Sequence, residues 1–145
     1  MTHKKALVII DIQNDITKNY REIIDDINKS IDWAVKNDIH VVYIRHENLS
    51  AGTRTFKPNT RGAELVSDLK IVSKNVFTKY KENALSSEEF ADFINKNEIC
   101  EFYLAGADAV ACVNQPVSIY VRQITKLMSY PIALQVMTKG KLTKC

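Results

Sequence analysis

The feature that most constrains the fold is an apolar run near the start of the chain, Ala6-Leu-Val-Ile-Ile10, which is followed at once by Asp11. A strand that is apolar at every position is typical of a parallel sheet, because helices then cover both of its faces. Asp11 therefore follows the carboxyl end of a central strand, and ligands of open α/β sheets bind at that edge. The run predicts both a class of fold and the place of a site within it.

Strand-like and helix-like segments alternate along the rest of the chain. Apolar residues recur at helical spacing over residues 19–37, and the sequence Ser-Ser-Glu-Glu at residue 86 resembles a capping box that starts another helix. The expected strands are 6–10, 41–44, 76–78, 102–105 and 132–137, the expected helices are 19–37, 62–69, 86–95 and 117–128, and 48–61 is an expected loop. This alternation predicts a three-layer, Rossmann-like α/β fold, with a parallel sheet of five or six strands and helices on both faces.

The order of the strands in the sheet also follows from this reading. We expect the first strand to be central, with the second and third strands on one side and the fourth and fifth on the other. The topological switch point then lies between the first and fourth strands. Asp11 and Cys112 follow those two strands, so they lie where an open α/β sheet places its ligand.

Size and composition exclude several classes of protein. The chain has 145 residues, so we expect one domain spanning 1–145. The net charge of +3 is spread without a basic stripe, which argues against nucleic acid binding. No apolar segment reaches the length of a membrane span, and the first strand begins too early for a signal peptide. The three cysteines fit neither a metal spacing nor a disulfide framework, which favours a reducing cytoplasm.

Cys112 is the best candidate nucleophile. It lies six residues beyond Gly106, where the fourth expected strand gives way to a helix-like segment. Backbone N–H groups and the positive end of a helix both favour a thiolate at such a turn. Lys79 ends the third expected strand, so it meets Asp11 and Cys112 if the three strands are neighbours. The residues alone leave alternatives open: a buried, inert cysteine, an aspartate that caps a turn, and a solvated lysine like Lys81.

Four segments in colinear order carry a family resemblance. They are Ala-Leu-Val-Ile-Ile-Asp-Ile-Gln-Asn-Asp at 6–15, Phe-Lys-Pro-Asn-Thr-Arg-Gly-Ala-Glu-Leu at 56–65, Phe-Thr-Lys at 77–79 followed by Ala-Leu at 84–85, and Leu-Ala-Gly-Ala-Asp-Ala-Val-Ala-Cys-Val at 104–113. Together they resemble the isochorismatase-like cysteine hydrolases, which include nicotinamidases and other small-amide hydrolases. The resemblance runs from about residue 6 to 113, most of the chain.

The resemblance implies a catalytic triad. Cys112 would attack an amide carbonyl, Asp11 would accept the thiol proton and pass it to the leaving amine, and Lys79 would hold the pair electrostatically. The implied substrate is a small amide or imide. The family also carries a non-proline cis peptide before the cysteine, which here would be the Ala107–Asp108 bond. The implied oxyanion site comprises Ala107, Asp108 and Ala111.

The resemblance also indicates how the pocket is lined. Ile16, His46 and Phe56 are the expected substrate-binding residues, and Ile16 stands where the family often has an aromatic residue. The aspartate–histidine metal motif of nicotinamidases is absent, because the chain reads Arg-His-Glu-Asn at 45–48. We therefore expect no metal and no cofactor.

Departures from the family pattern support an alternative function. Ala109 and Val110 replace a common Thr-Asp pair, Pro116 replaces a small helix residue, and the chain ends soon after the last expected strand. A catalytically degenerate relative that serves as a binding or assembly module is therefore the alternative to an active hydrolase. We expect a homo-oligomer in either case, because an exposed sheet edge is usually covered. A phosphate-handling domain ranks last, since no Gly-rich phosphate loop is present.

Overall fold

The protein folds around a parallel sheet. The computed structural model describes residues 5–17, 21–81, 86–99, 101–106 and 120–122. The strands in this part of the chain are β1 (Lys5–Ile10), β2 (His40–His46), β3 (Val76–Lys79), β4 (Glu101–Gly106) and β5 (Tyr120–Arg122). Their order is β3-β2-β1-β4-β5, and every neighbouring pair is parallel. The predicted central position of the first strand, between the second and the fourth, is confirmed.

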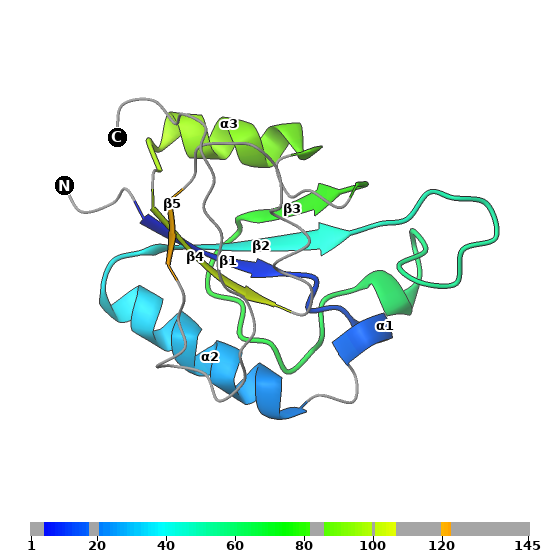
Figure 1. The fold of residues 1–145 in the computed structure, drawn as a ribbon. Helices are drawn as coiled ribbons and strands as arrows, with labels where there is room; N and C mark the ends of the chain where they lie inside the picture. The colour runs from blue at the N-terminus through cyan, green and yellow to red at the C-terminus, as the bar shows by residue number, and fades with distance from the viewer. Residues whose placement is uncertain (1–4, 18–20, 82–85, 100, 107–119, 123–145) are drawn as a thin grey trace.

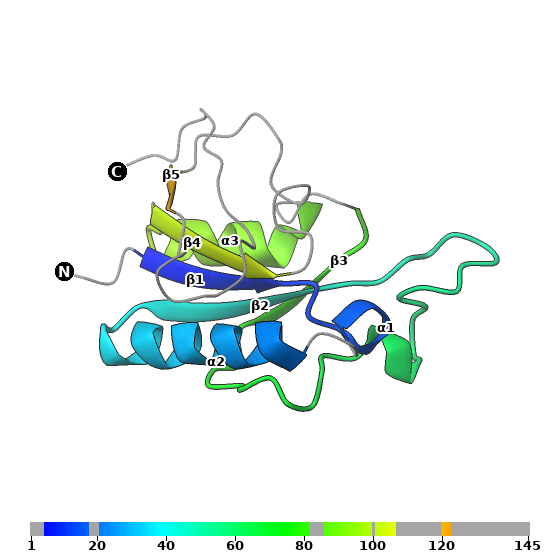
Figure 2. The same ribbon diagram turned by 60° about the horizontal axis from the view of Figure 1, so that its bottom comes forward.

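Helices lie on both faces of this sheet. They are α1 (Asn14–Thr17), α2 (Arg21–Lys36) and α3 (Glu88–Lys96), together with a short 3-10 turn, η1 (Arg61–Ala63). Figure 1 shows α3 on one side of the sheet and α2 on the other, and Figure 2 shows α2 lying along the sheet. The predicted three-layer α/β class is therefore confirmed. Among the described residues, no helix combines the length and the apolar character that crossing a membrane requires.

From Ala6 to Ile10, the central strand is apolar at every position because it serves two cores. Leu7 and Ile9 belong to the core between the sheet and α2, whereas Ala6, Val8 and Ile10 belong to the core under α3. Side chains of a strand alternate between its two faces, so a strand covered on both sides needs apolar residues throughout. This double burial holds β1 firmly at the centre of the sheet.

The helices begin and pack for local reasons. The α2 residues Ile24, Ile27, Ile31 and Ala34 are all buried against the sheet, at the spacing that the sequence predicted. The N-cap of α3 is Ser87, whose side chain accepts a hydrogen bond from the backbone N–H of Phe90 at 3.3 Å. That helix therefore starts slightly later than the predicted residue 86.

The predicted helix at 62–69 is wrong apart from its first turn. Only η1 forms there, and the backbone at Glu64 is already extended. Leu65 forms an antiparallel bridge with Gln13, and the N–H of Val66 donates to the carbonyl of Ile12 at 3.1 Å. The backbone groups of Leu65 and Val66 that pair with the segment after β1 cannot also form the hydrogen bonds of a helix. Long-range pairing therefore overrides the local helical pattern.

The predicted helix at 117–128 is also contradicted, because β5 lies inside it. Tyr120 pairs with Glu101 and Arg122 with Tyr103 in parallel register. The segment reads Ile-Tyr-Val-Arg, and β-branched and aromatic residues suit a strand that completes a sheet edge. The strand predicted at 132–137 lies outside the described residues.

Candidate functional site

The carboxyl ends of the central strands bring two predicted site residues together. Asp11 directly follows β1, and Lys79 is the last residue of β3. The strand between them is β2, yet the Nζ atom of Lys79 lies 3.6 Å from Oδ1 of Asp11. The side chains are only 1% exposed for Lys79 and 6% for Asp11. The structure therefore contains a buried ion pair at the edge where open α/β sheets bind ligands.

The backbone at Asp11 takes a conformation that turns the chain away from the sheet. Its φ is 60°, and its N–H donates to the carbonyl of Ile44 on β2 at 3.0 Å. Aspartate tolerates this left-handed region better than most residues, because its short side chain makes local polar contacts. The turn ends β1 and leaves the carboxylate at the sheet edge, within reach of Lys79.

Gly106 closes the same edge on the other side of β1. It pairs with Ile10 in the register of β1 and β4, and its φ is +150°. A Cβ atom at this position would overlap the carbonyl oxygen of Ile10. Only glycine suits both the close approach and the dihedral angle. The end of β4 is thereby held against the residue that precedes Asp11.

The predicted nucleophile and oxyanion residues lie beyond this glycine. Cys112, Ala107, Asp108 and Ala111 all fall within 107–119, outside the described residues. The predicted cis peptide between Ala107 and Asp108 lies there too. The roles of these residues therefore stay predictions.

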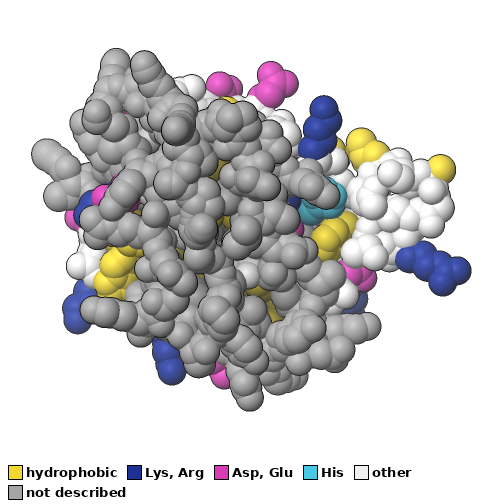
Figure 3. Space-filling view, in the orientation of Figure 1, with side chains coloured by type: hydrophobic (Ala, Val, Ile, Leu, Met, Phe, Trp, Pro, Cys, Tyr) yellow, Lys and Arg dark blue, Asp and Glu magenta, His cyan; other side chains and the backbone are white. Residues whose placement is uncertain are grey.

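The structure brings His46 and Phe56 together. His46 ends β2 and is the register partner of Lys79. Its ring centroid lies 5.5 Å from that of Phe56, which is buried although it belongs to the long loop. Figure 3 shows a histidine side chain, in cyan, beside hydrophobic side chains, in yellow, on this face of the molecule. Ile16 lies in α1, and its side chain is not among those described. Substrate contact by these three residues stays a prediction.

Sequence reasoning missed two polar residues that build this edge. The side chain of Gln13 is fully buried; its nitrogen donates to the carbonyls of His46 and Ala63, and its oxygen accepts from the N–H of His46. Oδ2 of Asp15 accepts from the N–H of Phe56 at 2.7 Å. The only local signal is their place in a polar cluster directly after a strand buried on both faces, and that place does not indicate which distant backbone groups they bond.

A second cation, Arg45, braces the end of β2. Its guanidinium donates to Glu47 at 3.2 Å and to the carbonyl of Ala63 at 3.0 Å, and it contacts the hydroxyl of Thr78 at 3.4 Å. These bonds connect β2 to both η1 and β3. Unlike Lys79, Arg45 is partly exposed and is directed to structural partners.

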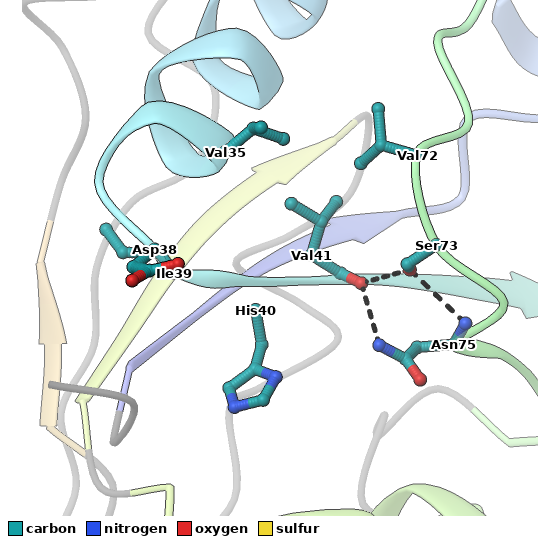
Figure 4. A pocket seen from close by; sticks show the side chains of 8 residues that line it. All are labelled: Val35, Asp38, Ile39, His40, Val41, Val72, Ser73 and Asn75. Carbon is teal, nitrogen blue, oxygen red and sulfur yellow. Dashed lines mark hydrogen bonds between the residues drawn. The ribbon is translucent and has the colours of Figure 1, made fainter. Parts of the chain in front are cut away.

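A hollow of about 270 Å³ lies at the opposite edge of the sheet, near the amino end of β2. Figure 4 shows Val35 and Val72 on its walls, and dashed lines from the carbonyl of Val41 to Ser73 and Asn75. The Ser73 hydroxyl donates to that carbonyl at 2.6 Å, and the Asn75 amide donates to it at 3.3 Å. The side chains of Ser73 and Asn75 therefore serve the backbone of β2 at this hollow.

The described residues contain no group of three His, Cys, Asp or Glu side chains that could hold a metal ion. Among the predicted site residues that the structure describes, Asp11 and His46 are the ones of a metal-ligating type, and a catalytic zinc typically takes three protein ligands. The donor set in this part of the chain therefore does not fit a zinc site.

Comparisons with known proteins agree with this geometry. The family model described as Isochorismatase domain matches residues 5–118. No curated protein matches the chain significantly.

Solved structures match the fold at low identity. N-carbamoylsarcosine amidase from Thermoplasma acidophilum has a TM-score of 0.68 and 18% identity, over 92% of this chain and 86% of that one. An isochorismatase-like hydrolase from Alkaliphilus metalliredigens has a TM-score of 0.66 and 18% identity, over 86% and 81%. Pyrazinamidase of Pyrococcus horikoshii, solved in complex with zinc, has a TM-score of 0.61 and 20% identity, over 73% and 72%. In two other structures of the family, the aligned part makes up 69% and 58% of the solved chain.

Proposed function

Since this chain belongs to the isochorismatase family, a family of hydrolases, we propose that it is a cysteine hydrolase that cleaves a carbon–nitrogen bond of a small amide or imide. The observation that carries the proposal is the buried ion pair of Asp11 and Lys79 at the carboxyl edge of the sheet. Two amidases among the similar structures, acting on N-carbamoylsarcosine and on pyrazinamide by their names, support an amide as the substrate.

The burial of this pair is itself a reason to assign it a function. Removing two charges from water costs several kcal/mol per ion, and their mutual attraction often only offsets that cost. Burial combined with a charged partner is also a common property of catalytic groups. A pair at 3.6 Å, longer than a good hydrogen bond, leaves Asp11 able to accept a proton from another group.

The proposed reaction has two stages. Asp11 accepts the thiol proton of Cys112, and the thiolate attacks the carbonyl carbon of the substrate. The carbon–nitrogen bond then breaks as Asp11 returns the proton to the leaving amine, which produces a thioester on Cys112. Asp11 then deprotonates a water molecule, whose oxygen attacks the thioester carbonyl. The carbon–sulfur bond breaks, the acid is released, and the proton on Asp11 returns to the thiolate of Cys112.

The other proposed roles are electrostatic and steric. The Lys79 ammonium stabilises negative charge on Asp11 and on the thiolate. Backbone N–H groups around Ala107, Asp108 and Ala111 stabilise the oxyanion of the tetrahedral intermediate. Ile16, His46 and Phe56 line the substrate pocket, and the contact between the His46 and Phe56 rings supports that role.

We further propose that the chain is a single domain over 1–145 that acts in the cytoplasm as a homo-oligomer. In the described sheet β3 is an edge strand, and two apolar residues on and after it, Val76 and Tyr80, are 37% and 53% exposed. An exposed edge of this kind is commonly covered by another chain.

The proposal is tested by mass spectrometry of the intact protein after brief incubation with a panel of small amides and imides. We expect one acyl adduct, located on Cys112 by peptide mapping, and release of the matching amine. Cys100→Ala and Cys145→Ala serve as controls and should acylate like the parent, whereas Cys112→Ala should not. An adduct on another cysteine, or turnover by Cys112→Ala, would contradict the mechanism. If no compound gives an adduct or turnover, that result would favour the non-enzymatic binding module.

A further inference from the structure

Gln13 stands at the junction of three segments of the site. Its side chain is 0% exposed, and its nitrogen donates to the carbonyls of His46 and Ala63 at 2.8 and 2.7 Å. Its oxygen accepts from the N–H of His46 at 2.8 Å. One carboxamide thus bonds both backbone groups of the last residue of β2, and also η1. Figure 2 shows η1 and α1 lying together beyond the ends of the central strands.

The geometry explains why an amide is needed at this position. The pairing of β1 and β2 ends with Ile10 opposite Ile44, and Asp11 then turns out of the strand. A continued strand would have offered an N–H and a carbonyl to residue 46. The Gln13 carboxamide also offers an N–H donor and a carbonyl acceptor, and it is planar like a peptide group. Its side chain therefore takes the place of the missing strand backbone, which lets Asp11 leave the sheet without opening its edge.

The bonds to His46 reach the proposed catalytic lysine. His46 is opposite Lys79 in the register of β2 and β3, and the N–H of Glu47 donates to the carbonyl of Lys79 at 3.0 Å. Gln13 lies two residues from Asp11 along the chain. The side chain of Gln13 therefore links the backbone that carries Asp11 to the backbone beside Lys79, on either side of their 3.6 Å contact.

We propose that Gln13 is a positioning residue, which sets the distance between Asp11 and Lys79 and the placement of His46 by bonding the end of β2 in place of a strand. The catalytic consequence rests on the proposed function, whereas the coupling between Gln13 and Lys79 does not. A misplacement of about 1 Å in a catalytic site costs on the order of 100-fold in rate, so loss of this link should lower kcat.

Two variants separate positioning from bulk stability. Gln13→Leu keeps much of the volume and removes the hydrogen bonds, while Gln13→Asn keeps an amide whose reach is shorter by one methylene and serves if the leucine variant does not fold. The matched control is Tyr43→Phe. Tyr43 is also fully buried, donates to the carbonyl of Lys70 and accepts from the N–H of Val72, but it acts at the other edge of the sheet.

The first measurement needs no substrate. The unfolding equilibrium is measured for the Gln13 variant, for Lys79→Met and for their combination, and the amide hydrogen exchange of His46 is followed by NMR. We expect non-additivity of more than about twofold in the unfolding equilibrium constant, as for residues in one network. We also expect exchange at His46 to rise by about 2- to 10-fold, as for one lost hydrogen bond. Tyr43→Phe should be additive with Lys79→Met and should leave the His46 amide unchanged.

The second measurement uses whichever amide acylates Cys112. In the Gln13 variant, kcat should fall by about 10- to 100-fold, and KM should rise as far as His46 is displaced from the pocket; Tyr43→Phe should change neither. Additive unfolding together with an unchanged His46 amide would overturn the proposal, whatever the chemistry proves to be. An unchanged kcat in a folded Gln13 variant would also overturn it. Failure of the parent protein to form an adduct would instead count against the proposed function and leave the coupling experiment decisive for Gln13.

Discussion

The strands of the sheet end in an amino edge and a carboxyl edge, formed by their amino and carboxyl ends, and the ion pairs near these two edges differ in burial. At the amino edge, Lys70 and Asp32 form an ion pair at 2.6 Å whose side chains are 45% and 60% exposed. At the carboxyl edge, Lys79 and Asp11 lie 3.6 Å apart and are almost fully buried. The shorter ion pair is the exposed one, and water and dissolved salt weaken the attraction between its two charges. The buried pair has the higher desolvation cost and the poorer hydrogen-bond geometry, so stability alone does not explain it.

Neutral hydrogen bonds hold the backbone at both edges. Near the amino edge, Asn28 bonds the backbone of Asp68 and Lys70, and Tyr43 bonds that of Lys70 and Val72. At the carboxyl edge, Gln13 serves the same purpose. Neutral side chains therefore hold the backbone segments together at both edges. The buried ion pair of Asp11 and Lys79 is present at the carboxyl edge in addition to these hydrogen bonds. This contrast supports a chemical role for Asp11 and Lys79.

The largest expected effect is on turnover. Asp11→Asn keeps the shape of the side chain and removes the proposed base, so kcat should fall by about 10²- to 10⁴-fold. Asp32→Asn, at the exposed pair, should leave kcat unchanged. Rates measured on the amide that acylates Cys112 decide this. Equal rates in a folded Asp11→Asn protein and the parent would remove the distinction between the two edges.

Removing one lysine at a time should separate the pairs by stability. Lys79→Met leaves a buried carboxylate without the Lys79 ammonium, and breaking a buried pair costs about 3–5 kcal/mol. Lys70→Met breaks an exposed pair, which contributes about 0–1 kcal/mol. Urea denaturation of both variants measures the free energy of unfolding. Similar losses in the two proteins would show that the edges do not differ as proposed. Lys81→Met, two residues from Lys79 and exposed, is a further control.

Two glycines allow a similar comparison of backbone constraints. Gly106→Ala forces a Cβ against the Ile10 carbonyl and should destabilise the protein by more than about 2 kcal/mol, since strain from overpacking adds to the dihedral penalty. Gly52 has φ +77°, but a Cβ atom added there would meet nothing within 4 Å, so Gly52→Ala should cost about 1 kcal/mol. Thermal denaturation would distinguish them, and equal shifts in Tm would contradict close approach at β4.

The smallest effect concerns the amino edge at high pH. Burial raises the pKa of Tyr43 above its ordinary value of 10.0, and the hydrogen bond from Val72 lowers it in part. The neutral phenol therefore contributes stability below about pH 10, and that contribution is lost as pH rises through the pKa of the folded state. Between about pH 9 and 11, the free energy of unfolding should fall more steeply for the parent than for Tyr43→Phe. Parallel curves would show that Tyr43 titrates normally.

The local sequence pattern was sufficient to predict the structure where one short segment shows which of its own residues are buried. The run from Ala6 to Ile10 is apolar because each residue faces one of two cores, so strand, parallel class and central position all followed from it. The meeting of Asp11 and Lys79 followed from the same rule, since parallel strands end at one edge. His46 and Phe56 were predicted as candidates, although nothing local indicated that their rings would be in contact.

Long-range pairing is what local pattern could not supply. The residues around Leu65 have helical spacing, but their backbone pairs with Ile12 and Gln13, far away in the chain. The segment at Tyr120 likewise becomes a strand because β4 offers it an edge. Gln13 was overlooked for the same reason: a glutamine after a strand is usually solvated, and its role depends on where His46 lies in space.

The central claim is that the Asp11–Lys79 pair serves chemistry rather than stability, and replacing both charges at once tests it most directly. Substituting a buried ion pair by apolar residues of similar size is often neutral or stabilising by about 1–4 kcal/mol. The double variant Asp11→Leu, Lys79→Met should therefore be more stable in urea than Lys79→Met alone, after a cost of about 1–2 kcal/mol for a leucine in the left-handed backbone at position 11, while acylation of Cys112 is lost. A double variant as unstable as Lys79→Met alone, with acylation of Cys112 retained, would contradict the account.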